Sequence, residues 1–219
     1  MQTVIFDMDG VIVDTEPVHR YAYFRHFEEL GISVTDAEYA AFTGRSTRNV
    51  YQHLKDRHDL PQPTQELVLA KREFFNRAFD EKPDLDLLDG VRHLIDDLHQ
   101  QGLELILASS ASHSTISRVM RRFELGPYFS HLLSGEDFAR SKPDPAIFEQ
   151  AAALARSPKN ECVVIEDSAN GVTAAKAAGI YCIGYRSEHS EGQDLHHADL
   201  VVAHFRELTA ARIAAIKAD

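Results

Sequence analysis

The spacing of apolar positions divides this chain into three stretches. An apolar run at Val4–Phe6 ends at Asp7, Asp9 and Gly10, which is typical of a short buried strand that stops at a turn. From Thr15 to about residue 80, apolar positions recur at helical spacing, without a convincing strand pattern. Beyond that, short apolar runs alternate with helical patterns. The chain is therefore expected to form a strand, a helical block and then a regular α/β arrangement.

The helical block predicts a small domain inserted after the first strand. A return linker is indicated at Glu81–Asp84, which contains Pro83. We expect an all-helical cap domain over residues 15–81, and a core domain built from residues 1–14 and 82–219. The helices expected in the cap cover residues 15–30, 37–42, 47–59 and 64–79.

The stretch after the linker predicts a parallel sheet. Strands that alternate with helices favour an α/β fold with a doubly wound parallel sheet, in which ligands bind beyond the carboxyl ends of the strands. The expected strands cover residues 103–108, 131–134, 162–165, 180–184 and 199–202. The expected helices cover residues 90–101, 112–123, 145–155, 168–178 and 205–217.

The first strand carries the first candidate site residues. Side chains two residues apart share a face of a strand, so Asp7 and Asp9 project together from its carboxyl end. Two adjacent carboxylates repel each other, and a bound cation or a proton relieves the repulsion. A lone pair of aspartates would indicate no more than a solvated strand end. Three later stretches carry groups that match this pair, and together they favour a site.

Two serines follow the strand at residues 103–108. A hydroxyl and free backbone N–H groups at a helix start suit a phosphate oxyanion, which makes Ser109 and Ser110 candidate phosphate-binding residues. The alternative is N-capping of the next helix by Ser110 or Ser112.

A lysine stands among prolines in the Ser-Lys-Pro-Asp-Pro stretch at residues 141–145. Lysines are by default solvated surface residues. Pro143 and Pro145 stiffen the chain around Lys142, which fits a lysine that points inward and neutralises aspartate and phosphate charge.

The strand at residues 162–165 ends in Glu166 and Asp167, the same layout as the first strand. Carboxylate oxygens suit Mg²⁺, which prefers a few carboxylates together with water and phosphate oxygens. Helix capping by Asp167 or Ser168 is the alternative, but it leaves Glu166 unexplained. The two strand ends together therefore indicate a magnesium site.

In this order, the stretches resemble the motifs of the haloacid dehalogenase-like superfamily. Residues 7–14 read Asp-Met-Asp-Gly-Val-Ile-Val-Asp, which resembles the first motif of that family. Ser109, the Lys142-Pro143 pair and the Glu166-Asp167 pair are similar to its second, third and fourth motifs. The resemblance covers essentially the whole chain and implies a Rossmann-like core with a helical cap.

The resemblance implies phosphoryl transfer through an aspartyl-phosphate. Asp7 would be the nucleophile, and Asp9 would act as general acid and then as general base. Ser109, Ser110 and Lys142 would hold the phosphoryl group. Dehalogenase relatives lack an acid/base at the second aspartate position, so Asp9 favours phosphate-ester chemistry.

The same resemblance implies Mg²⁺ as the cofactor. Asp167 would be a metal ligand, and Glu166 would be either a ligand or a residue that orients one. The implied metal-site residues are Asp7, Asp9, Glu166 and Asp167.

The helical block is similar to the cap of the β-phosphoglucomutase-like subfamily and would exclude water until substrate is bound. Residues 14–19 resemble the start of that cap and place Thr15 and His19 at its hinge, although a lone helical histidine can equally be a packing or surface residue.

The cap loop of that mutase carries a lysine and a glycine. Here Gly44 is kept and Thr43 stands at the lysine position. Arg45 or Arg48 could substitute for the lysine, or could be a surface charge. The substrate contacts expected from the cap are Thr15, His19, Gly44 and Arg48.

The missing cap lysine favours a phosphatase acting on sugar phosphates over a β-phosphoglucomutase. The two activities share every core residue named above, and they differ in whether water or a second hydroxyl reaches the aspartyl-phosphate. A non-catalytic protein that binds a phosphorylated ligand is a third alternative. The intact Asp7, Asp9, Lys142 and Asp167 count against it.

Charge and composition narrow the classes of partner that the protein is expected to bind. With 23 basic and 34 acidic residues the net charge is −11, which leaves no basic footprint for nucleic acid or an anionic membrane surface. No apolar run reaches the ~18 residues of a membrane span, and Met1–Thr3 shows no signal-peptide pattern. Cys162 and Cys182 lie in apolar runs, as reduced core cysteines do. We expect a cytoplasmic monomer that binds a small phosphorylated metabolite.

Overall fold

Two compact units make up the computed structural model, which describes residues 1–42, 45–186 and 192–217. The first unit, an α/β unit, comprises residues 1–14 and 86–219. The second, a helical unit, comprises residues 15–85. Each unit has its own buried apolar core.

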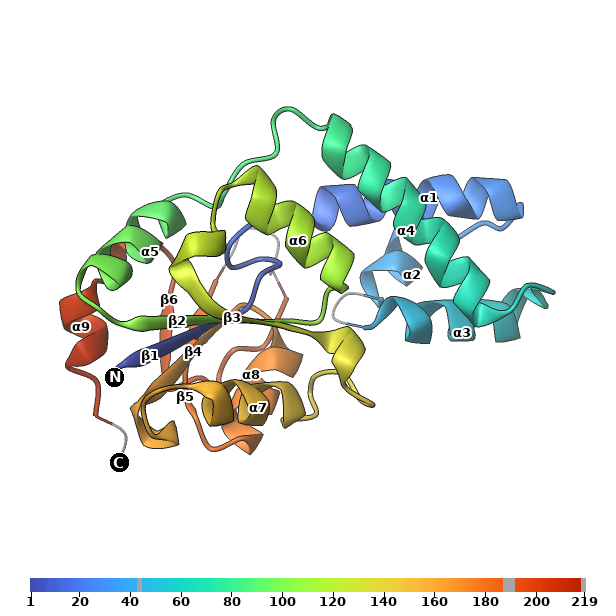
Figure 1. Ribbon diagram of the computed structural model, residues 1–219. Helices are drawn as coiled ribbons and strands as arrows, with labels where there is room; N and C mark the ends of the chain where they lie inside the picture. Colours follow the sequence, from blue (N-terminus) through green and yellow to red (C-terminus); the bar gives the residue numbers. More distant parts are fainter. Residues whose placement is uncertain (43–44, 187–191, 218–219) are drawn as a thin grey trace. The chain divides into compact units, whose positions relative to one another are not determined.

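A parallel sheet forms the centre of the α/β unit. Among its described residues, six strands pair in the order β3-β2-β1-β4-β5-β6 (Figure 1). β1 and β4 are buried along their whole length, as expected for central strands covered on both faces. The doubly wound parallel sheet predicted from the sequence is thereby confirmed. The strands are β1 (Thr3–Phe6), β2 (Glu104–Ser109), β3 (Phe129–Ser134), β4 (Cys162–Glu166), β5 (Tyr181–Tyr185) and β6 (Leu200–Val202).

Helices cover both faces of this sheet. α5 and α6 lie on one face and α7 and α8 on the other (Figure 1). Ile5, Phe148 and Val164 are among the fully buried residues of one continuous apolar cluster, so β1, β4 and α7 share a core. The helices are α5 (Val91–Gln100), α6 (His113–Arg122), α7 (Ala146–Leu154), α8 (Ala169–Ala177) and α9 (Ala210–Ala214).

The prediction of one helix over residues 205–217 was wrong. Phe205–Glu207 forms a 3₁₀ turn, Leu208 is extended, and α9 begins only after Thr209. The Thr209 hydroxyl accepts a hydrogen bond from the Arg212 N–H, which is the arrangement that starts a new helix. The apolar spacing runs through both pieces, but the local side-chain hydrogen bond divides them.

The helical unit contains α1 (Glu16–Leu30), α2 (Asp36–Ala40), α3 (Thr47–His58) and α4 (Thr64–Glu81). α4 packs against α1 and α3, around a core of buried aromatic residues that includes Tyr23, Phe27 and Tyr51. The turn at residues 82–85, expected from the sequence in the core domain, groups with this unit. It continues directly from the end of α4 and is closed by the hydrogen bond from the Leu85 N–H to the Lys82 carbonyl.

Two further features of the described residues concern membrane-spanning helices and the cysteines. No helix among them is both long enough and apolar enough to cross a membrane. Cys162 and Cys182 are buried and carry free thiols, as predicted.

Candidate active site

The carboxyl ends of three central strands bring the candidate residues to one edge of the sheet. Phe6 lies opposite Leu107 of β2 and opposite Ile165 of β4. The Asp7 N–H donates to the Ile165 carbonyl at 3.0 Å, so the chain continues in register past the end of β1. Asp7, Ser109 and Glu166 therefore emerge from neighbouring strands at the same edge.

Lys142 points into this edge, as its proline-rich surroundings predicted. Its ammonium donates to Asp7 Oδ1 at 2.6 Å, to Glu166 Oε1 at 2.8 Å and to the Ala108 carbonyl at 3.1 Å. The side chain is buried, and its nitrogen lies 4.6 Å from the centroid of the Phe148 ring. Burial alone would lower the pKa of Lys142, but the carboxylates of Asp7 and Glu166 raise it above its usual value, so the lysine stays charged.

Glu166 is held on both carboxylate oxygens. Oε1 accepts from Lys142, and Oε2 accepts from the N–H of Ser168 at 2.8 Å and from its hydroxyl at 2.9 Å. The Ser168 hydroxyl also accepts from the Gly171 N–H at 3.0 Å and so caps α8. With both oxygens engaged, Glu166 is less suited to bind a metal directly, and its contacts favour a third role, that of positioning Lys142.

Two glycines make room for the acidic side chains. A Cβ at Gly171 would lie 1.7 Å from Glu166 Oε1, and a Cβ at Gly10 would lie 2.0 Å from Asp167 Oδ2. Gly10 also has a φ of +80°, which other residues rarely adopt. The carboxylates therefore pack directly onto backbone that cannot carry a side chain.

Burial and mutual repulsion disfavour the ionised forms of Asp7 and Asp167 at this edge. Burial raises the pKa of Asp7 to about 7, against the lowering effect of Lys142, and the carboxylates of Glu166 and Asp9 add to the rise. Burial, with the negative charges of Glu166 and Asp7, also raises the pKa of Asp167 well above its usual value. A bound cation would favour the ionised forms of these carboxyl groups.

The donor types fit Mg²⁺, since carboxylate oxygens are its usual protein ligands. Because Lys142 and Ser168 engage both oxygens of Glu166, the donors best suited to a metal are Asp7, Asp9 and Asp167. In the part of the chain that the structure describes, no three His, Cys, Asp or Glu side chains are already spaced as a finished metal site. The donor chemistry and the raised pKa values of Asp7 and Asp167 thus fit the ion.

The two serines of β2 differ in their surroundings. Ser109 is fully buried, and its hydroxyl accepts a hydrogen bond from the Ala111 N–H at 3.0 Å. Ser110 is exposed at the start of the loop. The N-capping alternative applies to Ser112, whose hydroxyl accepts from the Thr115 N–H at the start of α6. Ser109 ends the strand next to β1 and Ser110 follows it, so both remain candidate phosphate-binding residues beside Asp7.

The candidate residues of the cap lie in the helical unit or outside the described residues. Thr15 is fully buried directly before α1, and His19 is in the first half of that helix. Arg48 is exposed and donates to Gln65 Oε1 at 2.7 Å, which matches the surface-charge alternative. Gly44 is outside the described residues.

A buried lysine in this unit was missed by the sequence reasoning. Lys71 is 3% exposed, its nitrogen is 2.5 Å from His19 Nδ1, and it lies 4.4 Å from the centroid of the Tyr23 ring. His19 itself stacks on Phe75 with 4.3 Å between ring centroids. Burial, and then the charge of Lys71, lower the pKa of His19 well below its usual value. The helical spacing did indicate that Lys71 is buried, because the lysine occupies a core position of α4 between Leu67 and Phe75.

Comparisons with known proteins agree with this geometry. A family model described as haloacid dehalogenase-like hydrolase matches residues 1–179. Over 207 residues the chain is 32% identical to the phosphorylated carbohydrates phosphatase of Thermotoga maritima, covering 92% of this chain and 93% of that protein. Over 214 residues it is 29% identical to the β-phosphoglucomutase of Bacillus subtilis, covering 95% and 92%.

A solved structure shows the same fold over nearly the full length. CbbY from Rhodobacter sphaeroides superposes with a TM-score of 0.86 at 27% identity, covering 95% of this chain and 96% of that one. That protein has been solved in complex with phosphate and, as a mutant, with xylulose-(1,5)-bisphosphate.

Proposed function

The chain belongs to the haloacid dehalogenase-like hydrolases, and we propose that it is a Mg²⁺-dependent phosphatase that hydrolyses small phosphate monoesters, sugar phosphates foremost, through an aspartyl-phosphate. The enzyme class, a phosphoric monoester hydrolase, agrees with the named activities of its relatives. The observation that carries the proposal is Lys142, buried and hydrogen-bonded to both Asp7 and Glu166 where the central strands end.

The proposed first step forms a covalent intermediate. A carboxylate oxygen of Asp7 attacks the phosphorus of the ester, and the bond from phosphorus to the ester oxygen breaks. Asp9 gives its proton to that leaving oxygen, so the alcohol departs neutral. Lys142 and the groups at Ser109 and Ser110 offset the negative charge of the phosphoryl oxygens.

The proposed second step regenerates the enzyme. Asp9, now ionised, takes a proton from water as the water oxygen attacks phosphorus. The bond between phosphorus and the Asp7 oxygen breaks, which releases inorganic phosphate and restores the carboxylate. When held by Asp7 and Asp167 next to Asp9, Mg²⁺ would supply positive charge that favours their ionised forms and the phosphoryl oxygens.

The helical unit would serve this site as a cap that excludes bulk water. The residues of that unit that the resemblance assigns to substrate binding are Thr15, His19, Gly44 and Arg48, and of these Arg48 is exposed and bonded to Gln65. A cytoplasmic location and a monomeric state are part of the proposal, and the free buried cysteines support a reducing compartment.

The test is phosphate release from a panel of sugar phosphates, with xylulose 1,5-bisphosphate and phosphoglycolate included because relatives are named for these or bound to them. We expect release with Mg²⁺ from the wild type, none after EDTA, and none from Asp7→Asn. Asp89→Asn, at an exposed position in the same unit, should keep full activity.

Other outcomes would redirect the assignment. Interconversion of β-glucose 1-phosphate and glucose 6-phosphate without phosphate release would make the protein a mutase. Binding of these esters without any turnover would favour the non-catalytic alternative. Phosphate release that persists both with EDTA and in Asp7→Asn would contradict the proposed chemistry.

A further inference from the structure

Two segments that follow neighbouring strands run together at the edge of the sheet. β2 and β3 are parallel partners, and Ser109 lies opposite Ser134 in their register. The β2 loop, residues 110–112, follows the first strand, and the β3 turn, residues 134–137, follows the second. The β2 loop contains Ser110, a proposed phosphate-binding residue, whereas nothing in the proposed mechanism uses the β3 turn.

A buried serine of the β3 turn holds the β2 loop through one peptide unit. The Ser134 hydroxyl donates to the Ala111 carbonyl at 2.7 Å, while the Ala111 N–H donates to the Ser109 hydroxyl at 3.0 Å. Ser109 and Ser134 are both fully buried. The backbone directly after Ser110 is therefore bonded on both sides to groups that water does not reach.

Close packing holds Ser110 itself. A Cβ built at Gly135 would lie 3.0 Å from both the Cα and the carbonyl oxygen of Ser110. Gly135 is in a 3₁₀ turn, a conformation open to any residue, so glycine is needed here for space. Any side chain at position 135 would push the backbone of Ser110 by a few tenths of an ångström.

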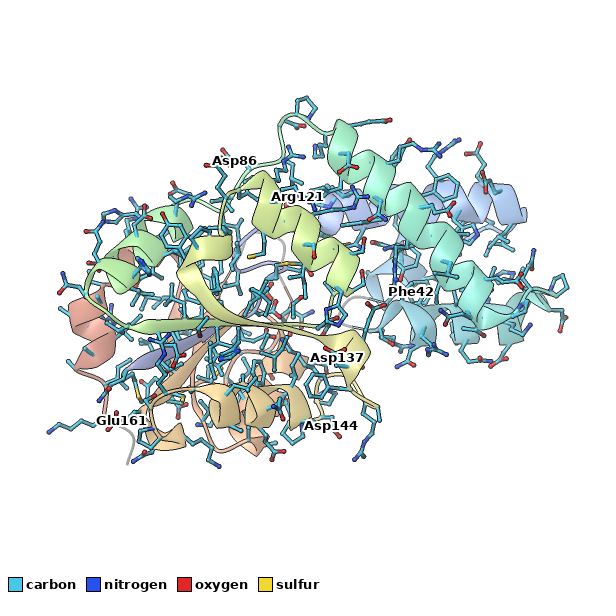
Figure 2. The ribbon with its side chains drawn as sticks, in the orientation of Figure 1. Phe42, Asp86, Arg121, Asp137, Asp144 and Glu161 are labelled. Carbon is cyan, nitrogen blue, oxygen red and sulfur yellow. The ribbon has the colours of Figure 1, made fainter. Side chains whose placement is uncertain are left out.

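The rest of the β3 turn contacts the start of α6. The Glu136 carboxylate accepts from the His113 N–H at 3.0 Å, and Asp137 Oδ1 is 2.8 Å from His113 Nε2. Figure 2 labels Asp137 in the segment that directly follows β3. The residues of the β3 turn thus contact Ser110, Ala111 and His113.

We propose that Ser134 and Gly135 are positioning residues that hold the β2 loop in the geometry that receives the phosphoryl group. This inference rests on the proposed function of Ser109 and Ser110. Hydrogen bonds to an anion weaken steeply as donors move off line, so a loop that is fixed before phosphate arrives binds it more tightly. Neither residue touches the substrate in this scheme; each acts through the backbone of the β2 loop.

The experiment measures inorganic phosphate as the probe, both as a product inhibitor with Mg²⁺ present and by calorimetric titration. Ser134→Ala removes the hydroxyl, and Gly135→Ala adds the methyl group that displaces Ser110. Neither change alters charge, so electrostatic attraction for phosphate stays constant. Ser130→Ala is the matched control for the first, since Ser130 is on the same strand and bonds Glu104 at the other end. Gly126→Ala is the control for the second, because a Cβ there meets nothing within 4 Å.

Displacement by a few tenths of an ångström should weaken phosphate binding by about five- to tenfold, well below the ~100-fold loss associated with a 1 Å misplacement. KM should rise in both variants with a smaller change in kcat, and both controls should match the wild type. A purely structural role would lower the melting temperature and leave the phosphate inhibition constant unchanged, and that result overturns the inference. If Ser134→Ala fails to fold, the phosphate affinity of Gly135→Ala tests the inference alone.

Different results would overturn the proposed function and the positioning role of Ser134 and Gly135. A wild type that binds phosphate but releases none from any ester removes the proposed function, while the variants can still be compared by titration. A wild type that turns over esters, with both variants binding phosphate as tightly as their controls, removes only the inference. A wild type that neither releases nor binds phosphate overturns both.

Discussion

The ammonium of Lys142 donates a 2.6 Å hydrogen bond to Oδ1 of Asp7, a residue 135 positions away in sequence, and both side chains are buried. The same ammonium donates to Glu166, so one cation joins the ends of β1 and β4. An arrangement of this kind is costly to build, because burying each charge carries a large desolvation penalty. Its retention at the edge where the central strands end is the main physical argument for a catalytic site.

Replacing that lysine should destabilise the fold as well as stop the reaction. Lys142→Met leaves Asp7 and Glu166 buried without their cation, and removing one partner of a buried pair costs about 3–5 kcal/mol. Urea unfolding at pH 8 measures the loss. Lys176→Met is the control, since the Lys176–Asp199 pair is partly exposed and should contribute no more than ~1 kcal/mol. Equal losses in the two variants would contradict the buried ion pair.

The raised pKa of Asp7 predicts a pH dependence of stability. An acid whose pKa is higher in the folded state than in the unfolded state contributes stability at low pH, and this is lost as pH rises through the folded value. For Asp7 the usual value is 3.8 and the folded value about 7, so the contribution is lost between about pH 4 and pH 7. Over this range the wild type should lose roughly 4 kcal/mol relative to Asp7→Asn, at about 1.4 kcal/mol per pKa unit.

Urea unfolding at pH 4 and pH 8, with EDTA present, tests this slope. Asp89→Asn should follow the wild type at both values. A stability difference between wild type and Asp7→Asn that stays constant with pH would show that folding does not raise the pKa of Asp7.

Magnesium should stabilise the folded protein more at pH 8 than at pH 5. Protons compete with the ion for the carboxylates of Asp7 and Asp167, and a ligand that binds only the folded state raises its stability. The measurement is the shift in melting temperature between EDTA and Mg²⁺ at each pH. Asp167→Asn should abolish most of the shift; a full shift in that variant would place the ion elsewhere.

Gly171→Ala should inactivate the enzyme although it changes only one methyl group. The new Cβ would lie 1.7 Å from Glu166 Oε1, so the carboxylate that holds Lys142 must move. Displacement of a catalytic group by about 1 Å costs about 100-fold in rate. Far-ultraviolet circular dichroism should remain unchanged, while kcat falls. Gly126→Ala, in open space, should keep both activity and stability, and an active Gly171→Ala would show that Glu166 is not needed in this position.

Lys71→Met should raise the pKa of His19. Burial and the charge of Lys71 both lower that pKa, and the substitution removes only the second cause. The new value should therefore rise but stay below the usual 6.5. A proton NMR titration of the His19 ring measures it, with Lys55→Met on α3 as the control. An unchanged pKa would mean that burial alone accounts for the shift.

Several features of this protein could be predicted because they are encoded locally. A strand, a turn and a helix each occupy a few consecutive residues, so the alternation of apolar runs predicts the parallel sheet. The acidic pairs at residues 7 and 9 and at 166 and 167 directly follow their strands for the same reason. Since parallel strands end at a common edge, strand ends rich in polar groups predict where a site forms.

Local patterns were insufficient where a nearby hydrogen bond or a distant contact decides the outcome. The apolar spacing over residues 205–217 could not show that Thr209 starts a separate helix. Lys71 reads as a surface lysine in isolation, and its burial against His19 and Tyr23 depends on how α1 and α4 pack.

The sequence by itself determined the fold class and the edge of the sheet at which the candidate acids, serines and lysine belong. Only the tertiary structure decided which atoms meet: that Lys142 bonds Asp7 and Glu166 together, and that Ser134 and Gly135 lie against the β2 loop. The physical reason is that spacing along the chain reports which face a residue occupies. Strand order and register bring distant residues within hydrogen-bond reach, and these depend on the packing of the whole α/β unit.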